Sequence, residues 1–323
     1  MNCNRLFFRS KKCIILLIQQ IRMEEPMKEG NIRDGVVDKR PVDLHVHSNK
    51  SDGTYTPVEL VQYAAKKNLR VMALTDHDTV DGLPEIKEAA GKIENAPEIV
   101  DGVELSTDLE GRDVHIVGLF INTEDPGLSQ YLQKFKDARD TRNEKMCDAL
   151  AKGLNMDISY EKLKNTFPGA VITRAHYARY MLEHKYISSM NEAFERWIGD
   201  DKPYYIPREK VRPEDAVELI KKASGIPILA HPVLYKFSLT RLEKLISDLK
   251  EAGLLGMETR YSTYTAGDTR QMMMLAEKYG LLESGGSDFH GSNKKDIDLG
   301  TGKGSLFVPY EIFERLKERR NLL

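Results

Sequence analysis

Short apolar runs alternate with amphipathic stretches along most of the chain after Pro41. The apolar runs are rich in Val, Ile and Leu and have the length of strands buried in a sheet. The predicted strands cover residues 42–48, 71–78, 99–105, 114–121, 226–231, 254–260 and 282–287.

The stretches between several of these strands favour helices, because their apolar residues recur three and four positions apart. Three of these stretches carry a proline where a first helical turn would lie. The predicted helices cover residues 57–67, 84–93, 213–223, 239–251 and 269–279. A strand followed by a helix, repeated about seven times, is typical of an α/β barrel with a largely parallel sheet.

One segment, residues 127–207, interrupts this alternation. It contains only helical patterns, of which the longest covers residues 131–152. We therefore expect a helical insertion that lies over one face of the barrel, and a barrel built from residues 41–126 and 208–323.

The first forty residues differ from the rest of the chain. Residues 1–22 contain basic residues and no acidic ones, and they enclose a short apolar run at residues 14–18. This run is too short for a membrane helix, and no small-residue cleavage site follows it. We expect residues 1–40 to be a disordered extension or the product of a misassigned start codon.

Composition narrows the class of protein. The 48 Lys and Arg residues nearly balance the 50 Asp and Glu residues, which argues against binding along a long nucleic-acid duplex. Hydrophobic residues at 41% and charged residues at 30% are typical of a soluble globular protein with no membrane contact. The three cysteines form no disulfide framework, so we expect a reducing compartment, the cytoplasm. These patterns do not indicate an oligomeric state.

Histidines gather at the ends of the predicted strands. Six of the eight lie on a predicted strand or just after one: His45, His47, His77, His115, His231 and His290. A single histidine is usually a core or surface residue, but the carboxyl ends of barrel strands share one rim, where several side chains can converge. Acidic residues accompany them: Asp43, Asp52, Asp76, Asp78, Glu104 and Asp288.

The spacing of these residues suits metal coordination. His45 and His47 lie two positions apart on a strand, so both rings point to the same face. Asp288 and His290 repeat this spacing, and Gly53 allows the chain after Asp52 to turn back toward the same site. Imidazole and carboxylate ligands without thiolates suit manganese, iron or zinc, and they argue against a structural zinc knot.

These motifs, taken in order, resemble those of the PHP (polymerase and histidinol phosphatase) family of metal-dependent phosphoesterases. The resemblance covers residues 41–291 and rests on five motifs: DLHVHS at 43–48, TDHD at 75–78, GVE at 102–104, AHP at 230–232 and SDFH at 287–290. It implies a distorted (β/α)7 barrel, which agrees with the seven strands counted from the apolar pattern.

The resemblance also implies two to three divalent ions and their ligands. The nine positions fall into three groups: His45, His47, Glu104 and Asp288 for one ion; Glu104 again, with His115 and His231, for a second; Asp52, His77 and His290 for a third. Asp52 stands where some relatives have histidine, so manganese is expected, with iron or zinc as alternatives. The same resemblance implies that Glu104, His77 and Asp288 are catalytic.

Within the family, the chain resembles the branch that removes phosphate from 3′,5′-bisphosphorylated nucleosides and, in some members, trims short RNA from its 5′ end. The resemblance rests on the close spacing of Glu104 and His115, the helical insertion, and the run ITRAHYAR at 172–179. In this run, Arg174 offers a planar fork for a phosphate, and His176 is a second donor. The alternative is that Arg174 is a solvated charge and His176 a residue on a helix face.

We therefore expect a metal-dependent phosphoric ester hydrolase acting on the 3′-phosphate of a 3′,5′-nucleoside bisphosphate, or on short 5′-phosphorylated RNA. One alternative is a histidinol phosphate phosphatase with the same metal cluster. An alternative of another class is a non-catalytic metal or nucleotide sensor. Tyr204 and Tyr205 either stack on a base or pack the insertion against the barrel.

Overall fold

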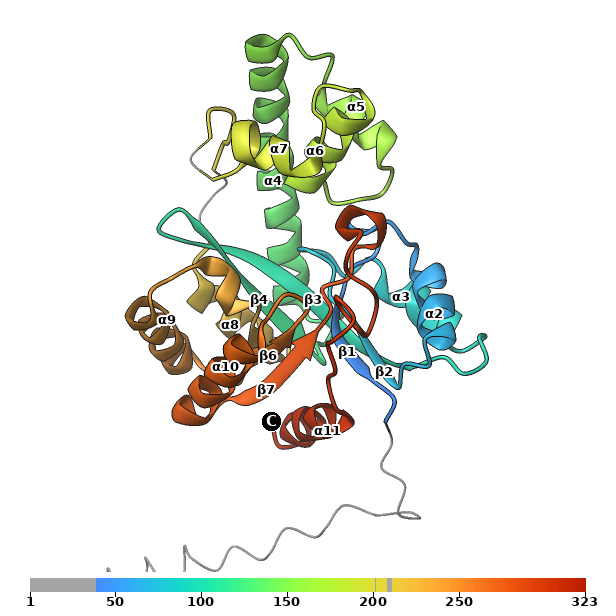
Figure 1. The fold of residues 1–323 in the computed structure, drawn as a ribbon, viewed down its shortest axis with the longest axis vertical. Coiled ribbons are helices and arrows are strands. Elements are labelled where there is room, and N and C mark those ends of the chain that lie inside the picture. Colours follow the sequence, from blue (N-terminus) through green and yellow to red (C-terminus); the bar gives the residue numbers. More distant parts are fainter. Residues whose placement is uncertain (1–38, 201, 208–210) are drawn as a thin grey trace, which may run out of the picture. The chain divides into compact units, whose positions relative to one another are not determined.

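A single sheet of seven strands lies at the centre of the fold (Figure 1). In this computed structural model, which describes residues 39–200, 202–207 and 211–323, the strands pair in the order of the sequence. Their bounds are β1 Val42–Val46, β2 Val71–Leu74, β3 Glu98–Leu109, β4 Arg112–Leu119, β5 Ile226–Leu229, β6 Gly256–Tyr261 and β7 Leu282–Gly286. All seven predicted strands are present. The predicted extension, residues 1–40, lies outside the described residues except for its last two positions.

The sheet nearly closes on itself, because the chain that follows β7 runs beside β1. The backbone N–H of Asp288 donates to the carbonyl of His45 at 2.8 Å, and the N–H of His47 donates to the carbonyl of Phe289 at 3.0 Å. Val46 and Phe289 form a parallel bridge. The prediction of a distorted (β/α)7 barrel is thus confirmed.

One strand of the barrel, β4, runs against the others. It pairs antiparallel with both β3 and β5, whereas the remaining neighbours in the sheet pair in parallel. A hairpin joins β3 to β4, and both of its turn residues, Glu110 and Gly111, have positive φ values of 54° and 83°, as tight hairpin turns require. The start of β4 therefore lies at the rim where the parallel strands end.

The helices predicted from apolar periodicity are also present. They are α2 Pro57–Lys66, α3 Leu83–Ala90, α8 Pro213–Lys222, α9 Leu239–Ala252 and α10 Ala266–Tyr279, and α11 Tyr310–Asn321 follows β7. α2 begins with a complete capping box, in which Thr56 Oγ1 accepts from the N–H of Glu59 and the Glu59 carboxylate accepts from the N–H of Thr56. Among the helices in the described part of the chain, none combines the length and apolar character that crossing a bilayer requires.

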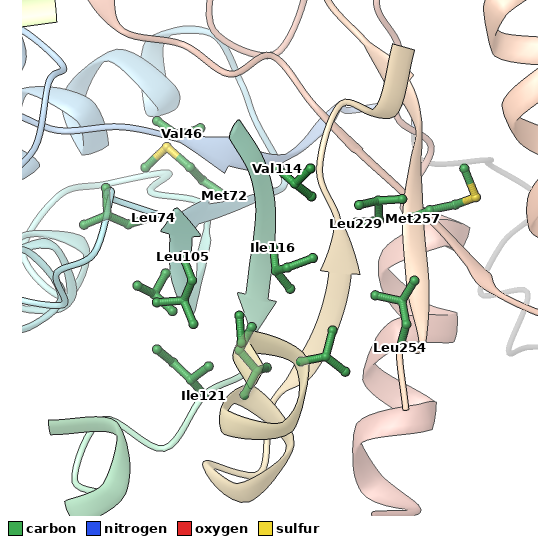
Figure 2. Close-up of a cluster of buried hydrophobic side chains, with 14 of the residues drawn as sticks. Val46, Met72, Leu74, Leu105, Val114, Ile116, Ile121, Leu229, Leu254 and Met257 are labelled. Atoms are coloured by element: carbon green, nitrogen blue, oxygen red, sulfur yellow. The ribbon is translucent and has the colours of Figure 1, made fainter. Parts of the chain in front are cut away.

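Side chains on the outer face of the strands form the main hydrophobic core (Figure 2). Leu74, Leu105, Ile116, Leu229 and Met257 are buried there together with residues of α2, α3, α8, α9 and α10. This burial gives the apolar stripe of each helix its partner, and it contributes roughly 1.5–3 kcal/mol for each large side chain.

The inner face of the strands changes character along the barrel. Near α11 it is apolar, since Val117 and Leu119 of β4 pack in one cluster with Phe313 of that helix. Because side chains alternate along a strand, His115 lies on the same side of β4 as these two residues, two positions nearer the rim. On β3, Glu104 likewise lies on the inner face, nearer the rim than the inner-facing residues that precede it in the strand. The barrel therefore has an apolar floor and a polar rim.

The segment between β4 and α8 is helical. It contains α4 Pro126–Leu154, α5 Tyr160–Thr166, α6 Arg174–Glu183, α7 Met190–Ala193 and the π-helical turn η1 Phe194–Ile198. These helices share an apolar cluster of their own, centred on residues such as Tyr177 and Met181. That residues 127–207 form an insertion that lies over the active site remains a prediction.

α4 links this second cluster to the barrel. Leu128 and Leu132, in its first turns, belong to the main core, and Met146 and Leu150 belong to the second cluster. Between the two, the buried face of α4 is polar and carries three residues: Arg139, Arg142 and Asn143. Buried arginines on a helix require charged or polar partners, so this stretch marks where α4 passes the rim of the barrel.

The side chain of Asp43 links β1 to the chain that follows β7. We predict that Asp43→Asn destabilises the fold. Its Oδ1 accepts from the N–H of Ser287 at 2.8 Å and its Oδ2 from the N–H of Gly300 at 2.8 Å. Burial raises the pKa of this carboxyl to about 6, so it is ionised at pH 8. An amide would place a donor against one of these N–H groups, which costs about 1–3 kcal/mol.

Urea unfolding at pH 8 measures this loss, with the exposed Asp296→Asn as the matched control. Equal stability of the two variants would show that the Asp43 carboxylate does not hold the closure.

Candidate metal centre and substrate cavity

All nine predicted ligands meet at the rim of the barrel. Their ligand atoms form four overlapping groups in which all atoms lie within 4.8 Å of one another: His47, Asp52, His77 and His290; His45, His47 and Asp288; His45, Glu104 and His231; His77, Glu104 and His115. The structure thus brings the whole predicted set together. In the structure, His115 shares a group with His77, whereas the grouping taken from the motifs assigns these two residues to different ions. The division of the ligands among individual ions remains a prediction.

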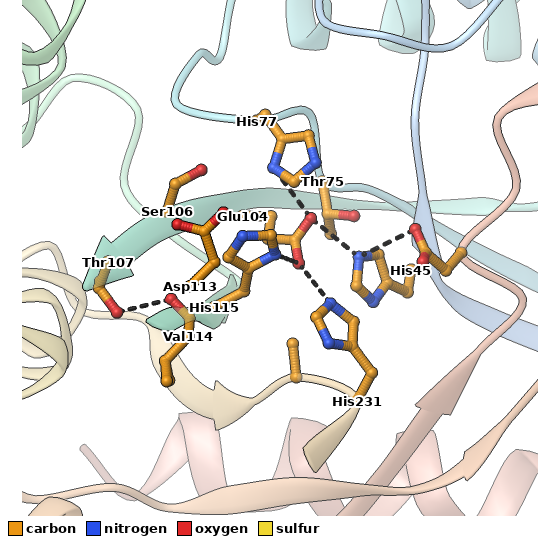
Figure 3. Close-up of polar contacts among 12 residues, drawn as sticks. His45, Thr75, His77, Glu104, Ser106, Thr107, Asp113, Val114, His115 and His231 are labelled. Carbon is orange, nitrogen blue, oxygen red and sulfur yellow. Dashed lines mark hydrogen bonds and ion pairs between the residues drawn. The ribbon is translucent and has the colours of Figure 1, made fainter. Parts of the chain in front are cut away.

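Glu104, at the rim end of the inner face of β3, lies at the centre of the cluster (Figure 3). Its two carboxylate oxygens lie within 3.2 Å of ring nitrogens from five histidines: His45, His47, His77, His115 and His231. His115 reaches this carboxylate because β4 is antiparallel, which places the beginning of that strand at the rim. A carboxylate in this position can bridge two cations.

Glu258 on β6 orients two of the ligands, and it was not identified from the sequence. Its Oε1 accepts from Nδ1 of His45 at 2.8 Å, which turns Nε2 of that ring toward the cluster. Its Oε2 accepts from the backbone N–H of His231 at 2.6 Å. A carboxylate behind a ligand histidine fixes the tautomer and orientation of the ring. The signal available in the sequence was an acidic residue within a predicted strand.

Several buried atoms of the cluster fit a bound cation. Among the described residues, Nε2 of His45, Nε2 of His47, Nδ1 of His77 and Oδ1 of Asp52 have no hydrogen-bond partner. Polar atoms buried in this way usually have a partner. Divalent ions, which imidazole nitrogens and carboxylate oxygens coordinate, would satisfy such atoms. The residues present therefore fit a metal centre.

The electrostatics of the cluster also favour cations. Burial raises the pKa of Glu104, but His77, His45 and His115 outweigh it and hold this pKa well below its usual range. The pKa values of Asp52 and Asp288 are also well below their usual range, because neighbouring cationic groups outweigh burial. The three carboxylates are thus ionised at neutral pH, which concentrates negative charge among the ring nitrogens.

A cavity of about 400 Å³ opens over the cluster. One wall carries the ligands Asp52, His77, His115 and His290. The other wall carries residues of the helical segment, three of them arginines: Arg139, Arg142 and Arg174. A cavity with metal ligands on one side and guanidinium groups on the other can hold a molecule that carries two phosphates.

Arg174, the first residue of α6, lines this cavity and belongs to a network. Its Nη1 donates to Asp200 at 2.8 Å, and its Nη2 donates to Asp113. Its guanidinium lies 4.9 Å from the ring centre of Tyr205, which also lines the cavity. Arg174 is therefore held in place at the cavity wall and is not a solvated surface charge.

His176 lies behind the cavity wall. Its Nδ1 accepts from the N–H of Thr173 at 2.9 Å, and the ring bonds to the backbone of Ser51. Burial lowers the pKa of His176 to about 4, so the ring is neutral at neutral pH. Thr173 in turn donates from Oγ1 to Oδ2 of Asp52 at 3.0 Å. This geometry gives His176 a supporting role behind Asp52 and not a place on the cavity wall, in contrast to the expected phosphate contact.

Arg139 and Arg142 are further cavity residues that were not identified from the sequence. Both are buried on α4, and Arg139 forms an ion pair with Asp78 of the TDHD motif. They interrupt the apolar stripe of α4 at positions three apart, and this interruption was the signal that could have revealed them. The ion pair of Arg139 joins it to a residue about sixty positions away, which periodicity cannot show.

Comparison with known proteins gives similarity over most of the chain. A family model described as a PHP domain matches residues 43–180. A 5′-3′ exoribonuclease of Haemophilus influenzae is 38% identical over 77% of this chain and 89% of its own length. A 3′,5′-nucleoside bisphosphate phosphatase of Chromobacterium violaceum is 32% identical over 80% of this chain and 90% of its own length.

A solved structure is similar as well. It is described as an amidohydrolase from Chromobacterium violaceum with bound sulfate and no metal, and it is 31% identical to this chain. The match covers 86% of this chain and 96% of the solved chain, with a TM-score of 0.77. The similarity in fold thus extends over most of the chain.

We predict that Glu258→Gln weakens metal binding by about 10–100-fold. A glutamine can accept from Nδ1 of His45 or from the N–H of His231, but its amide donor then opposes the other group. Metal content after dialysis against graded concentrations of a chelator measures the change. Glu277→Gln, at an exposed position of α10, is the control. Wild-type affinity in Glu258→Gln would exclude this orienting role.

Proposed function

Because the chain belongs to the PHP family of metal-dependent phosphoesterases, as its motifs indicated, we propose that it hydrolyses the 3′-phosphate of 3′,5′-nucleoside bisphosphates and trims short 5′-phosphorylated RNA. One relative is named a 5′-3′ exoribonuclease and another a 3′,5′-nucleoside bisphosphate phosphatase. The observation that carries the proposal is one cavity that is lined both by predicted metal ligands and by three arginines.

Both activities correspond to the cleavage of one kind of bond. In a bisphosphate, water adds to the 3′-phosphorus, the bond from phosphorus to O3′ breaks, and O3′ takes a proton. In RNA with a 5′-phosphate, the same bond of the first nucleotide breaks, and the phosphate stays on the next nucleotide. Each reaction releases a nucleoside 5′-monophosphate. One site that holds a 5′-phosphate and a 3′-phosphorus therefore serves both substrates.

The nine ligands described above would hold two or three divalent ions, with manganese expected and iron or zinc as alternatives. Ions bound there lower the pKa of coordinated water and offset negative charge on the phosphoryl oxygens. Glu104, His77 and Asp288 form the catalytic set that we propose. The two ionised carboxylates hold the centre together, and His77 lines the cavity, where it faces the reacting phosphate.

Arg174 and Arg142 would bind the phosphate that is not hydrolysed. A guanidinium binds two phosphate oxygens at once, and the contacts of Arg174 with Asp113 and Asp200 hold its side chain at the wall before substrate arrives. His176 acts indirectly in this proposal, because its contact with Thr173 supports Asp52.

We place the enzyme in the cytoplasm and regard small nucleotides and short RNA as its substrates. Cys147, which is a buried free thiol beside Tyr177, suits a reducing compartment.

Turnover of adenosine 3′,5′-bisphosphate compared with histidinol phosphate tests the choice of substrate. Faster turnover of histidinol phosphate would favour the histidinol phosphatase alternative. Tight nucleotide binding without hydrolysis of either compound by the metal-loaded protein would favour a sensor.

We expect Glu104→Gln and His77→Ala to lower kcat by at least about 100-fold, because several kcal/mol of stabilisation of the reacting phosphate depends on the metal centre. Circular dichroism should show an intact fold, and the exposed Glu314→Gln is the control. Removal of metal with a chelator should abolish wild-type activity, and added manganese should restore it. Near wild-type turnover of Glu104→Gln in metal-replete buffer would refute the assignment.

We expect Arg174→Ala to reduce the preference for a second phosphate. The ratio of kcat/KM for adenosine 3′,5′-bisphosphate to kcat/KM for adenosine 3′-monophosphate should fall by about 10–100-fold, the value of a charged hydrogen bond. General damage to the site would lower both values and leave their ratio unchanged. Arg196→Ala, at an exposed position, is the control. An unchanged ratio would assign the 5′-phosphate to other residues.

A further inference from the structure

A second cavity, of about 610 Å³, borders the metal centre. It shares Asp113, His115 and Arg174 with the cavity already described, and it also touches the ligand His231. We call it the outer groove. Its remaining wall follows the 3-10 turn η2, Pro232–Tyr235, and the residues after it. The two cavities thus meet at the metal ligands, with Arg174 between them.

The outer groove carries an excess of positive charge. Three cationic residues that do not line the first cavity line this one: Arg112, Lys236 and Arg241. Together with Arg174 they make four cationic groups against two carboxylates, Asp113 and Asp200. Both carboxylates pair with Arg174, and Arg241 pairs with Glu110. A polyanion would therefore be attracted to this groove.

Aromatic and apolar side chains lie among these charges. The guanidinium of Arg241 lies 4.2 Å from the ring centre of Phe237, and that ring is 5.6 Å from the ring of Tyr235. The hydroxyl of Tyr235 donates to the carbonyl of Ala230 at 2.5 Å, which fixes the ring. Leu234 is 44% exposed in the same groove. Cations interleaved with aromatic rings are typical of surfaces that bind single-stranded nucleic acid.

We propose that the outer groove binds the nucleotides that follow the scissile phosphate in single-stranded RNA, and this inference rests on the function proposed above. The first nucleotide and its 5′-phosphate would occupy the cavity lined by Arg142. The next nucleoside is attached to the reacting phosphorus, so it must extend from the metal centre. The outer groove begins at that centre, at His115 and His231. A bisphosphate has no atoms beyond this point and leaves the groove empty.

The double variant Arg112→Ala/Lys236→Ala tests the proposal, because both residues line the outer groove and neither lines the first cavity. For a 5′-phosphorylated hexaribonucleotide, kcat/KM should fall at least about tenfold, the lower limit for the loss of a charged contact. Its dependence on salt should also become shallower, by about 1.4 in the logarithmic slope, since each contact with a single strand contributes about 0.7. Hydrolysis of adenosine 3′,5′-bisphosphate should not change.

The control is Lys152→Ala/Lys222→Ala, which removes the same charge from two exposed positions. It should leave cleavage of the hexaribonucleotide and its dependence on salt as in the wild type. Cleavage of the hexaribonucleotide by Arg112→Ala/Lys236→Ala at the wild-type rate, with an unchanged salt slope, would overturn the proposal for the groove while leaving the proposed function intact.

Failure of the proposed function would look different, because the wild-type protein would then hydrolyse neither substrate. In that case, fluorescence anisotropy with a labelled hexaribonucleotide decides. Binding that is lost in Arg112→Ala/Lys236→Ala and retained in Lys152→Ala/Lys222→Ala supports the groove. Equal binding by the two double variants, or equally strong binding of a duplex of the same sequence, overturns it.

Discussion

The structure depends on one ionised carboxylate that lies inside a barrel. Glu104 is almost completely buried, and a carboxylate in such a place would be strongly destabilising without positive partners. Five imidazole nitrogens surround it, and they come from β1, β4 and the segments that follow β2 and β5. The barrel brings these segments together at one rim. The negative charge of Glu104 thus determines which side chains the fold must bring to the rim, and it favours the binding of cations there.

The sequence was sufficient for the strands, which leave local patterns, and its motifs, read through the family resemblance, identified the histidines and carboxylates that meet at the rim. His45 and His47 share a strand face by their spacing, and the strands show as apolar runs. The reversal of β4 was not predicted, since strand direction depends on pairing between distant segments. Glu258 and Arg139 were missed for the same reason. Each acts through a partner far along the chain, His45 and Asp78 respectively.

In the proposed function, the two cavities let one centre accommodate substrates of different length. The helical segment contributes the arginines of the first cavity, and the turn after β5 contributes the outer groove. Arg174 and its partners Asp113 and Asp200 stand between them. The barrel provides all of the predicted ligands, so changes in either flanking segment can alter what the cavities bind while the chemistry of the rim stays the same.

The closure between β1 and the chain after β7 also affects how the protein acquires its metal during synthesis. His45 and Asp288 lie far apart in the sequence, yet the N–H of Asp288 bonds to the carbonyl of His45. A nascent chain still attached to the ribosome has neither Asp288 nor His290 in place until nearly all of the barrel has been made. The complete coordination site therefore forms only late in translation, after long-range pairing that is intrinsically slow. An incompletely translated chain therefore lacks part of the histidine and carboxylate cluster.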